Sequence, residues 1–81
     1  MELLNNIAKL HTTELGAVRI KRNLSIESDV VVAWCREKVL SSEAVIERKG
    51  KNWYITTDGS VITVNAYSYT IITAHKLRKE R

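Results

Sequence analysis

Three side chains in the second half of the chain have the chemistry of an acid–base site. His75 carries an imidazole, which takes up and releases a proton near neutral pH. Tyr54 adds a phenol, and Lys49 adds a cation. A ribonuclease that works without a metal needs one group to take the proton of the 2′-hydroxyl, one to protonate the leaving oxygen, and cations on the phosphate. We therefore take His75, Tyr54 and Lys49 as the candidate catalytic residues.

Other side chains in the same part of the chain suit binding rather than catalysis. Lysine and arginine neutralise phosphates, and tyrosines serve both in base stacking and in protein interfaces. Hydroxyl and amide groups add hydrogen bonds. The candidate residues for contact with a nucleic acid or a protein partner are Lys51, Asn65, Tyr67, Tyr69, Thr73, Lys76 and Arg78.

No pattern in the sequence predicts a cofactor or a metal ion. The two histidines, His11 and His75, and the single cysteine, Cys35, lack the spacing of metal ligands. The chain has no glycine-rich phosphate-binding loop, and its Ser, His and Asp residues are too scattered to predict a triad. Cys35 lies in a valine-rich segment and is predicted to be a small buried hydrophobic residue.

Two turn sequences place the candidate residues on a β-meander. Asp58-Gly59 separates two runs rich in β-branched and aromatic residues, and Asp-Gly tolerates the positive φ angles of a two-residue hairpin turn. Gly50-Lys51 can form a second such turn. Both hairpins sort apolar residues to one face and polar residues to the other. The predicted pairs on the apolar face are Ile55 with Ile62, Trp53 with Val64, Ile46 with Ile55, and Arg48 with Trp53, where Arg48 is expected to lie across the Trp53 ring.

The register of the fourth strand depends on the length of the loop before it. A three-residue loop sends Thr73 and His75 to the polar face and leaves Ile71 partly exposed, whereas a two-residue loop sends Thr73 and His75 inward. We favour the first, because burying Thr73 and His75 without partners costs more than burying aliphatic side chains. The predicted pairs are then Val64 with Ile72 and Ile62 with Ala74.

This sheet separates the best carboxylate from the histidine. With the strands in sequence order, Glu47 and His75 lie three strands apart, roughly 14 Å at the usual strand spacing, so they cannot act as a direct pair. His75 would have to work with Tyr67, Tyr69, Thr73 or the cations of the C-terminal tail.

The first half of the chain predicts short amphipathic helices. Apolar residues recur at helical spacing from Leu3 to Leu10 and again within Glu14–Leu24, and Thr12 or Thr13 can cap the second helix. Ser28-Asp29 can start a third helix that ends near Val39. The sequence therefore predicts one α+β domain over residues 1–81, with a helical part at 1–40 and a β-meander at 44–77. Two or three short N-terminal helices pack on one face of this four-stranded antiparallel sheet, and the other face stays open.

The distribution of charge favours a polyanionic partner. The chain has a net charge of +4, and residues 48–81 hold seven Lys or Arg against two Asp or Glu, so the positive charge lies with the sheet. RNA, or a nucleic-acid-processing protein complex, is the expected partner. The sequence has neither a membrane-spanning run nor a signal peptide, so we expect a cytoplasmic location and no membrane partner. A homodimer formed through the sheet or its edge strand is a third alternative.

Three segments of the sequence resemble a known family. Leu10–Gly16, Arg48–Tyr54 and Ile62–Lys76 are similar to a family of small bacterial proteins catalogued as a domain of unknown function. The resemblance covers nearly the whole chain and implies no activity. A looser, architectural similarity is to the barnase, colicin and RelE-like ribonucleases, in which helices precede a four-stranded antiparallel sheet that acts on RNA. This similarity implies catalytic or RNA-contacting roles for Lys49, Lys51, Tyr54, His75 and Arg78.

A non-catalytic inhibitor is the alternative function. A small domain with an exposed polar face bearing tyrosines could dock on a nucleic-acid-processing complex, as phage anti-CRISPR proteins do. Salt-insensitive binding would favour this alternative over RNA binding.

Overall fold

The computed structural model describes residues 2–24, 26 and 31–77. The predicted helix start at Ser28-Asp29 and the candidate residue Arg78 lie outside these residues. The elements in chain order are α1 (Glu2–Asn5), a 3₁₀ turn η1 (Ile7–Lys9), α2 (Glu14–Leu24), α3 (Val31–Val39), β1 (Val45–Lys49), β2 (Asn52–Thr57), β3 (Ser60–Asn65) and β4 (Ile71–Lys76). The predicted α+β architecture is confirmed.

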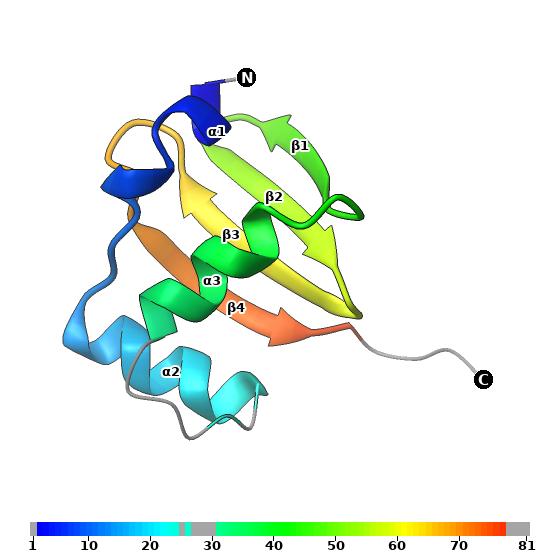
Figure 1. The fold of residues 1–81 in the computed structure, drawn as a ribbon. Coiled ribbons are helices and arrows are strands. Elements are labelled where there is room, and N and C mark those ends of the chain that lie inside the picture. Colours follow the sequence, from blue (N-terminus) through cyan, green and yellow to red (C-terminus); the bar gives the residue numbers. More distant parts are fainter. Residues whose placement is uncertain (1, 25, 27–30, 78–81) are drawn as a thin grey trace.

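The sheet is a meander whose strands lie in the order β1-β2-β3-β4, all antiparallel (Figure 1). At the second turn Asp58 and Gly59 have φ angles of 50° and 73°, which Gly and Asp tolerate better than other residues. This turn sets the register of β2 and β3. The predicted pairs Ile55–Ile62, Trp53–Val64, Ile46–Ile55 and Arg48–Trp53 are all present.

The predicted register of β4 is correct over its second half and wrong at its start. Ile62 pairs with Ala74, as expected, but Val64 pairs with Ile71 instead of Ile72, because a β-bulge interrupts the β3–β4 ladder. Ile71 is consequently buried, with 1% of its surface exposed, whereas Ile72 is 37% exposed. The cause is a longer loop than expected. The Asn65 N–H donates to the Thr70 carbonyl and the Tyr69 N–H to the Asn65 carbonyl, so four residues turn the chain. The bulge absorbs the extra residue.

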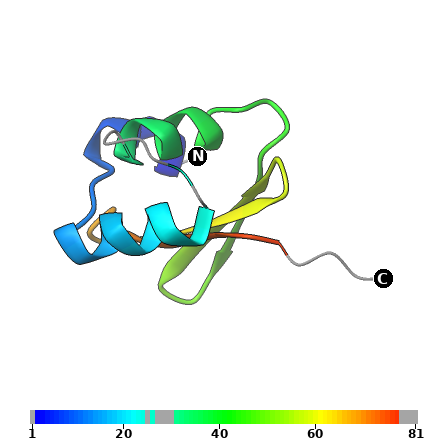
Figure 2. The ribbon, with the colours of Figure 1, turned by 90° about the horizontal axis from the view of Figure 1, so that it is seen from below.

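The helices do not form a single layer. In both ribbon views α1 and α3 lie over one face of the sheet, whereas α2 runs alongside β4 at the sheet edge (Figures 1 and 2). The core lies between these helices and the sheet. Its buried members include Leu3 from α1, Ile20 and Leu24 from α2, Val31, Cys35 and Val39 from α3, and Trp53, Ile55, Ile62, Val64, Ile71 and Ala74 from the strands.

The start of α2 fits closely against β4. The Thr13 hydroxyl accepts a hydrogen bond from the Gly16 N–H at 3.0 Å, which makes Thr13 the N-terminal cap of α2. The Thr12 hydroxyl donates to the Ile71 carbonyl at 2.9 Å. Gly16 is buried where a Cβ atom would overlap Thr12 Oγ1 and approach Thr13 Oγ1 to 3.2 Å. The absence of a side chain at Gly16 therefore lets α2 dock on the edge of the sheet.

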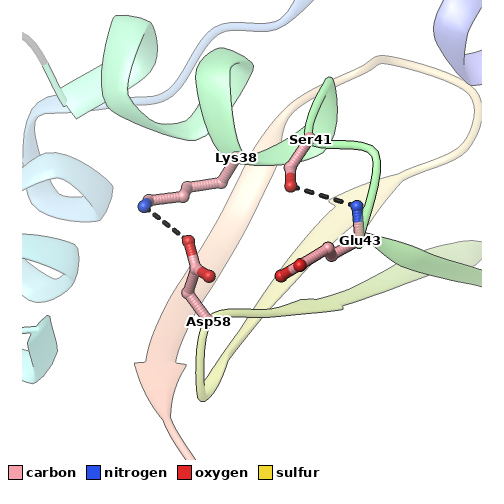
Figure 3. Close-up of polar contacts among 4 residues, drawn as sticks. All are labelled: Lys38, Ser41, Glu43 and Asp58. Atoms are coloured by element: carbon pink, nitrogen blue, oxygen red, sulfur yellow. Dashed lines mark hydrogen bonds and ion pairs between the residues drawn. The ribbon is translucent and has the colours of Figure 1, made fainter.

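Two cations of α3 connect this helix to the β2–β3 turn and to the segment after α1. The Lys38 ammonium group reaches the Asp58 carboxylate in the β2–β3 turn at 2.8 Å, and Asp58 raises the pKa of Lys38 through this bond (Figure 3). Just beyond α3, Ser41 Oγ accepts from the Glu43 N–H at 3.2 Å. On the other side of α3, Arg36 donates to the carbonyls of residues 7, 8 and 10 at 3.3 to 3.4 Å. Arg36 thereby fixes the segment that leads to His11.

Candidate functional site: a polar row on the open sheet face

The face of the sheet opposite α1 and α3 carries the polar side chains of the strands; we call it the open face. In the described part of the chain neither α1 nor α3 lies over it (Figures 1 and 2). Thr63, at its centre, is nevertheless buried, because it pairs with Tyr54 on one side and Thr73 on the other. The register assigns the following residues to the open face: Val45, Glu47, Lys49, Asn52, Tyr54, Thr56, Val61, Thr63, Asn65, Thr73 and His75.

One row of the open face continues beyond the four strands. Lys49 pairs with Asn52, and Asn52 with Asn65. Asn65 closes the next loop with Thr70, and Thr70 forms a parallel bridge with His11. Bridge partners in a sheet point to the same side, so all five side chains lie on the open face. We call Lys49, Asn52, Asn65, Thr70 and His11 the polar row.

Hydrogen bonds orient the side chains at one end of the polar row. His11 Nδ1 lies 2.9 Å from the Lys9 carbonyl, which can only accept, so Nδ1 carries the proton. Nε2 lies 3.1 Å from the Thr70 hydroxyl, which can donate to it when Nε2 carries no proton. The Thr70 oxygen in turn lies 2.7 Å from Ser68 Oγ, which can donate to it. An imidazole and two hydroxyls thus form a continuous chain.

The two amide side chains in the middle of the polar row already form hydrogen bonds within the protein. Asn65 Oδ1 accepts from the backbone N–H groups of Tyr67 and Ser68, each at 2.9 Å, and so shapes the β3–β4 loop. Only the amide nitrogen of Asn65 remains to donate to a ligand. Asn52 Nδ2 lies 3.4 Å from the Tyr54 hydroxyl on the same strand. Tyr54 is half-buried, with its hydroxyl held beside the row.

Aromatic rings and cations gather around the loop at this end of the sheet. The Arg48 guanidinium lies 5.3 Å from the centre of the Trp53 ring, as predicted, and 5.6 Å from the centre of the Tyr67 ring. Tyr67 is 72% exposed. Lys9 Nζ lies 5.7 Å from the centre of the Tyr69 ring. The predicted binding residues Tyr67 and Tyr69 therefore stand beside cations, although the sequence does not reveal which cations.

The structure does not bring the three candidate catalytic residues together. Lys49 and His75 lie three strands and four residues apart, roughly 20 Å between Cα atoms at standard sheet spacing. Tyr54 and His75 lie roughly 12 Å apart by the same measure. His75 lies at the opposite end of the open face from Lys49 and Asn65, whereas Thr73 lies in the central row with Thr63. The register places Lys76, which pairs with Ser60, on the other face of the sheet. A long ligand could contact both ends of the face. The three candidate catalytic residues, however, cannot all reach the same reacting bond.

Sequence reasoning missed His11, Ser68 and Thr70 as members of a site. Their contact depends on the parallel bridge between His11 and Thr70, which lie 59 positions apart, and no local sequence pattern predicts such a bridge. The hydroxyl-rich run from Ser68 to Thr70 was the only signal available. Among residues 2–24, 26 and 31–77, no group of three or more His, Cys, Asp or Glu side chains is placed to hold a metal ion.

The chain belongs to a family of proteins of unknown function, DUF3781, whose model matches residues 4–75. The predicted family resemblance is thereby confirmed, and the match contains the whole polar row. No curated protein and no solved structure matches the chain. The similarity to ribonucleases stays a prediction. No helix in the described part of the chain is long and apolar enough to cross a membrane.

Proposed function

We propose that the protein binds single-stranded RNA through the open face, with the polar row as its centre, and does not cleave it. The observation that carries this proposal is the row itself. Five neighbouring side chains present a cation, two amides, a hydroxyl and an imidazole along one line on an uncovered surface. These are the groups that contact phosphates, sugars and base edges in nucleic-acid complexes.

The charge near the row supports an anionic ligand. Lys49 belongs to the row, and Lys51 follows it in the β1–β2 turn; both are exposed. Lys9 and Arg48 stand at the same end of the sheet, beside Tyr69 and Tyr67, although Arg48 lies on the opposite face with Trp53. Glu47 is the only acidic residue that the register places on the open face. Phosphates along a strand would therefore meet several cations and little repulsion.

A single strand fits this surface better than a duplex. Proteins that bind single-stranded RNA on a sheet use exposed aromatic rings for stacking and polar groups for the edges of unpaired bases. Tyr54 beside the row and Tyr67 at its margin could stack with successive bases. An RNA partner would be met in the cytoplasm, the location that the sequence predicts.

Binding without cleavage follows from the separation of the candidate catalytic groups. Acid–base catalysis requires both groups within hydrogen-bond reach of the same reacting phosphate. Tyr54 lies roughly 12 Å from His75 and Lys49 roughly 20 Å from it. In the described part of the chain His75 also has no polar partner that would orient its ring.

The test is fluorescence anisotropy with a labelled single-stranded RNA 12-mer at 50 and 150 mM salt. We expect the Lys49→Ala/Lys51→Ala variant to bind at least tenfold more weakly at 50 mM salt. Its log–log salt slope should be smaller by about 1.4, since each neutralised phosphate of a single strand contributes about 0.7. Arg22→Ala, which removes an exposed cation from α2, is the matched control and should stay within twofold of wild type. No binding by wild type, or equal losses in the control, would overturn the proposal.

A denaturing gel of the same RNA separates binding from cleavage. We expect intact RNA with both the wild-type protein and His75→Ala. Cleavage by the wild type that disappears in His75→Ala would instead establish a ribonuclease with His75 in its site.

A further inference from the structure

The outward side of α2 carries a second stripe of residues at helical spacing. Leu15, Val18, Arg19, Arg22 and Asn23 line a hollow of about 220 Å³, which we call the α2 groove. Gly16, Ile20 and Leu24 point the other way, into the core. One side of helix α2 is therefore buried in the core, and the opposite side exposes further apolar residues to the solvent.

Two aliphatic side chains of the α2 groove are left in water. Leu15 is 78% exposed and Val18 is 53% exposed. They lie three positions apart, so they are neighbours on the helix surface. Covering both would remove apolar surface from water, which favours association.

Arginines frame the aliphatic pair. Arg19 follows Leu15 by four positions and Arg22 follows Val18 by four, so each guanidinium lies one turn from an aliphatic side chain. The residues that line the groove include no acid. Within the part of the chain that the structure describes, neither Arg19 nor Arg22 forms an ion pair. The groove thus combines apolar contact with uncompensated positive charge.

The size of the hollow indicates what could enter it. Small-molecule and cofactor sites usually measure about 300 to 1,000 Å³, so a hollow of about 220 Å³ is small for such a ligand. It suits one or two side chains that anchor a protein segment. A nucleic acid would use the arginines and gain little from Leu15 and Val18. The apolar pair therefore favours a protein.

We propose that the α2 groove is a docking site for an acidic, amphipathic segment of a partner protein. An aliphatic or aromatic side chain of that segment anchors against Leu15 and Val18, and its Asp or Glu side chains pair with Arg19 and Arg22. This is the mode in which short segments lay an apolar face into a groove while charges set their specificity. The site does not depend on the proposed RNA binding. α2 approaches the open face at Thr73, in the row next to the polar row, where Asn23 Nδ2 lies 3.4 Å from Thr73 Oγ1.

The test is a selection from random 12-residue peptides displayed on phage, with the folded protein as bait. A counter-selection on Leu15→Ser/Arg19→Glu/Arg22→Glu removes peptides that bind elsewhere; the three positions are exposed, so this variant should keep the wild-type unfolding midpoint. We expect the enriched peptides to carry at least one large apolar residue with two or more Asp or Glu within four positions of it. Enrichment of peptides without acidic residues, or no enrichment over the counter-selected variant, would overturn the proposal.

An enriched peptide, synthesised with a fluorescent label, then locates the site. Leu15→Ser alone and Arg19→Glu alone should each weaken its binding at least fivefold, whereas Lys49→Ala/Lys51→Ala, the matched control on the polar row, should stay within twofold. Amide chemical shifts should change mainly within residues 14–24. Failure of the RNA proposal would leave these results unaltered. Displacement of the peptide by the RNA 12-mer, or equal loss in the control, would show that the groove is not a separate protein site.

Discussion

The hydroxyl of Thr70 forms a hydrogen bond with Nε2 of His11 across 3.1 Å, and so joins two residues that lie 59 positions apart. The backbone makes the same connection, because His11 N–H donates to the Tyr69 carbonyl at 3.2 Å and Ile71 N–H to the His11 carbonyl at 2.7 Å. The backbone at His11 therefore pairs with the outer edge of the sheet where β4 begins. His11 also adds an imidazole to a surface otherwise built from strands.

The side-chain bond between His11 and Thr70 should be measurable as a coupling free energy. We expect a double-mutant cycle of His11→Ala and Thr70→Val, followed by urea denaturation, to give about 0.5 to 1.5 kcal/mol, the net value of a typical hydrogen bond. Additive single losses would contradict the bond. Thr73→Val paired with His11→Ala is the control and should show no coupling, because Thr73 lies further along β4.

Gly16→Ala should destabilise the protein, although alanine usually strengthens a helix by about 1 kcal/mol relative to glycine. The new Cβ would displace the Thr12 hydroxyl from its bond to the Ile71 carbonyl. We expect a net loss of about 1 kcal/mol in the free energy of unfolding. In a Thr12→Ala background the loss should shrink or reverse, because the displaced hydroxyl is gone. An equal loss in both backgrounds would place the strain elsewhere.

Asn65 allows structure and binding to be separated. Asn65→Asp keeps the oxygen that accepts from Tyr67 and Ser68, so the loop and the unfolding midpoint should be preserved. The added negative charge should weaken RNA binding about tenfold at 50 mM salt. Asn65→Ala removes the acceptor and should cost about 1 to 2 kcal/mol of stability. Unchanged RNA affinity in Asn65→Asp would remove Asn65 from the contact surface.

Cys35 should make stability fall at alkaline pH. Burial raises the pKa of its thiol from 9.0 to about 12, so above pH 9 the thiol ionises in the unfolded chain and stays protonated in the folded one. Its contribution is complete below pH 9 and is lost as the pH rises toward 12. Between pH 9.0 and 10.5 the loss should be about 1.6 kcal/mol, because the slope rises to about 1.4 kcal/mol per unit only once the unfolded thiol is mostly ionised. Cys35→Ala, less stable at every pH, should show a flatter decline by that amount; an identical decline would contradict the assignment.

The sequence predicted those parts of the fold that depend on neighbouring residues. The Asp58-Gly59 turn fixed the central pairs of the sheet, and the cap at Thr13 fixed the start of α2. Ile71 and Ile72 were assigned to the wrong positions because a single extra loop residue and a compensating bulge cannot be distinguished from a continuous strand by hydrophobic pattern.

The candidate site was less predictable for a related reason. Lys49, Tyr54 and Asn65 were found from their residue types and the register of the first three strands. His11 joined them only through the bridge to Thr70, which depends on how the whole chain closes. The position of α2 beside β4 likewise follows from the space that Gly16 leaves and not from the amphipathic pattern of the helix.

The packing of α2 on β4 has a consequence for how the protein is made. Ribosomes deliver α2 early and β4 last among the described elements, yet Ile20 and Leu24 of α2 are buried in the same core as Ile71 and Ala74 of β4. During synthesis the core side of α2 therefore stays exposed, in addition to Leu15 and Val18 on its outward side, until β4 has left the ribosome. Folding should be a late, nearly all-or-none event, and the unfinished chain is the form most in need of a chaperone.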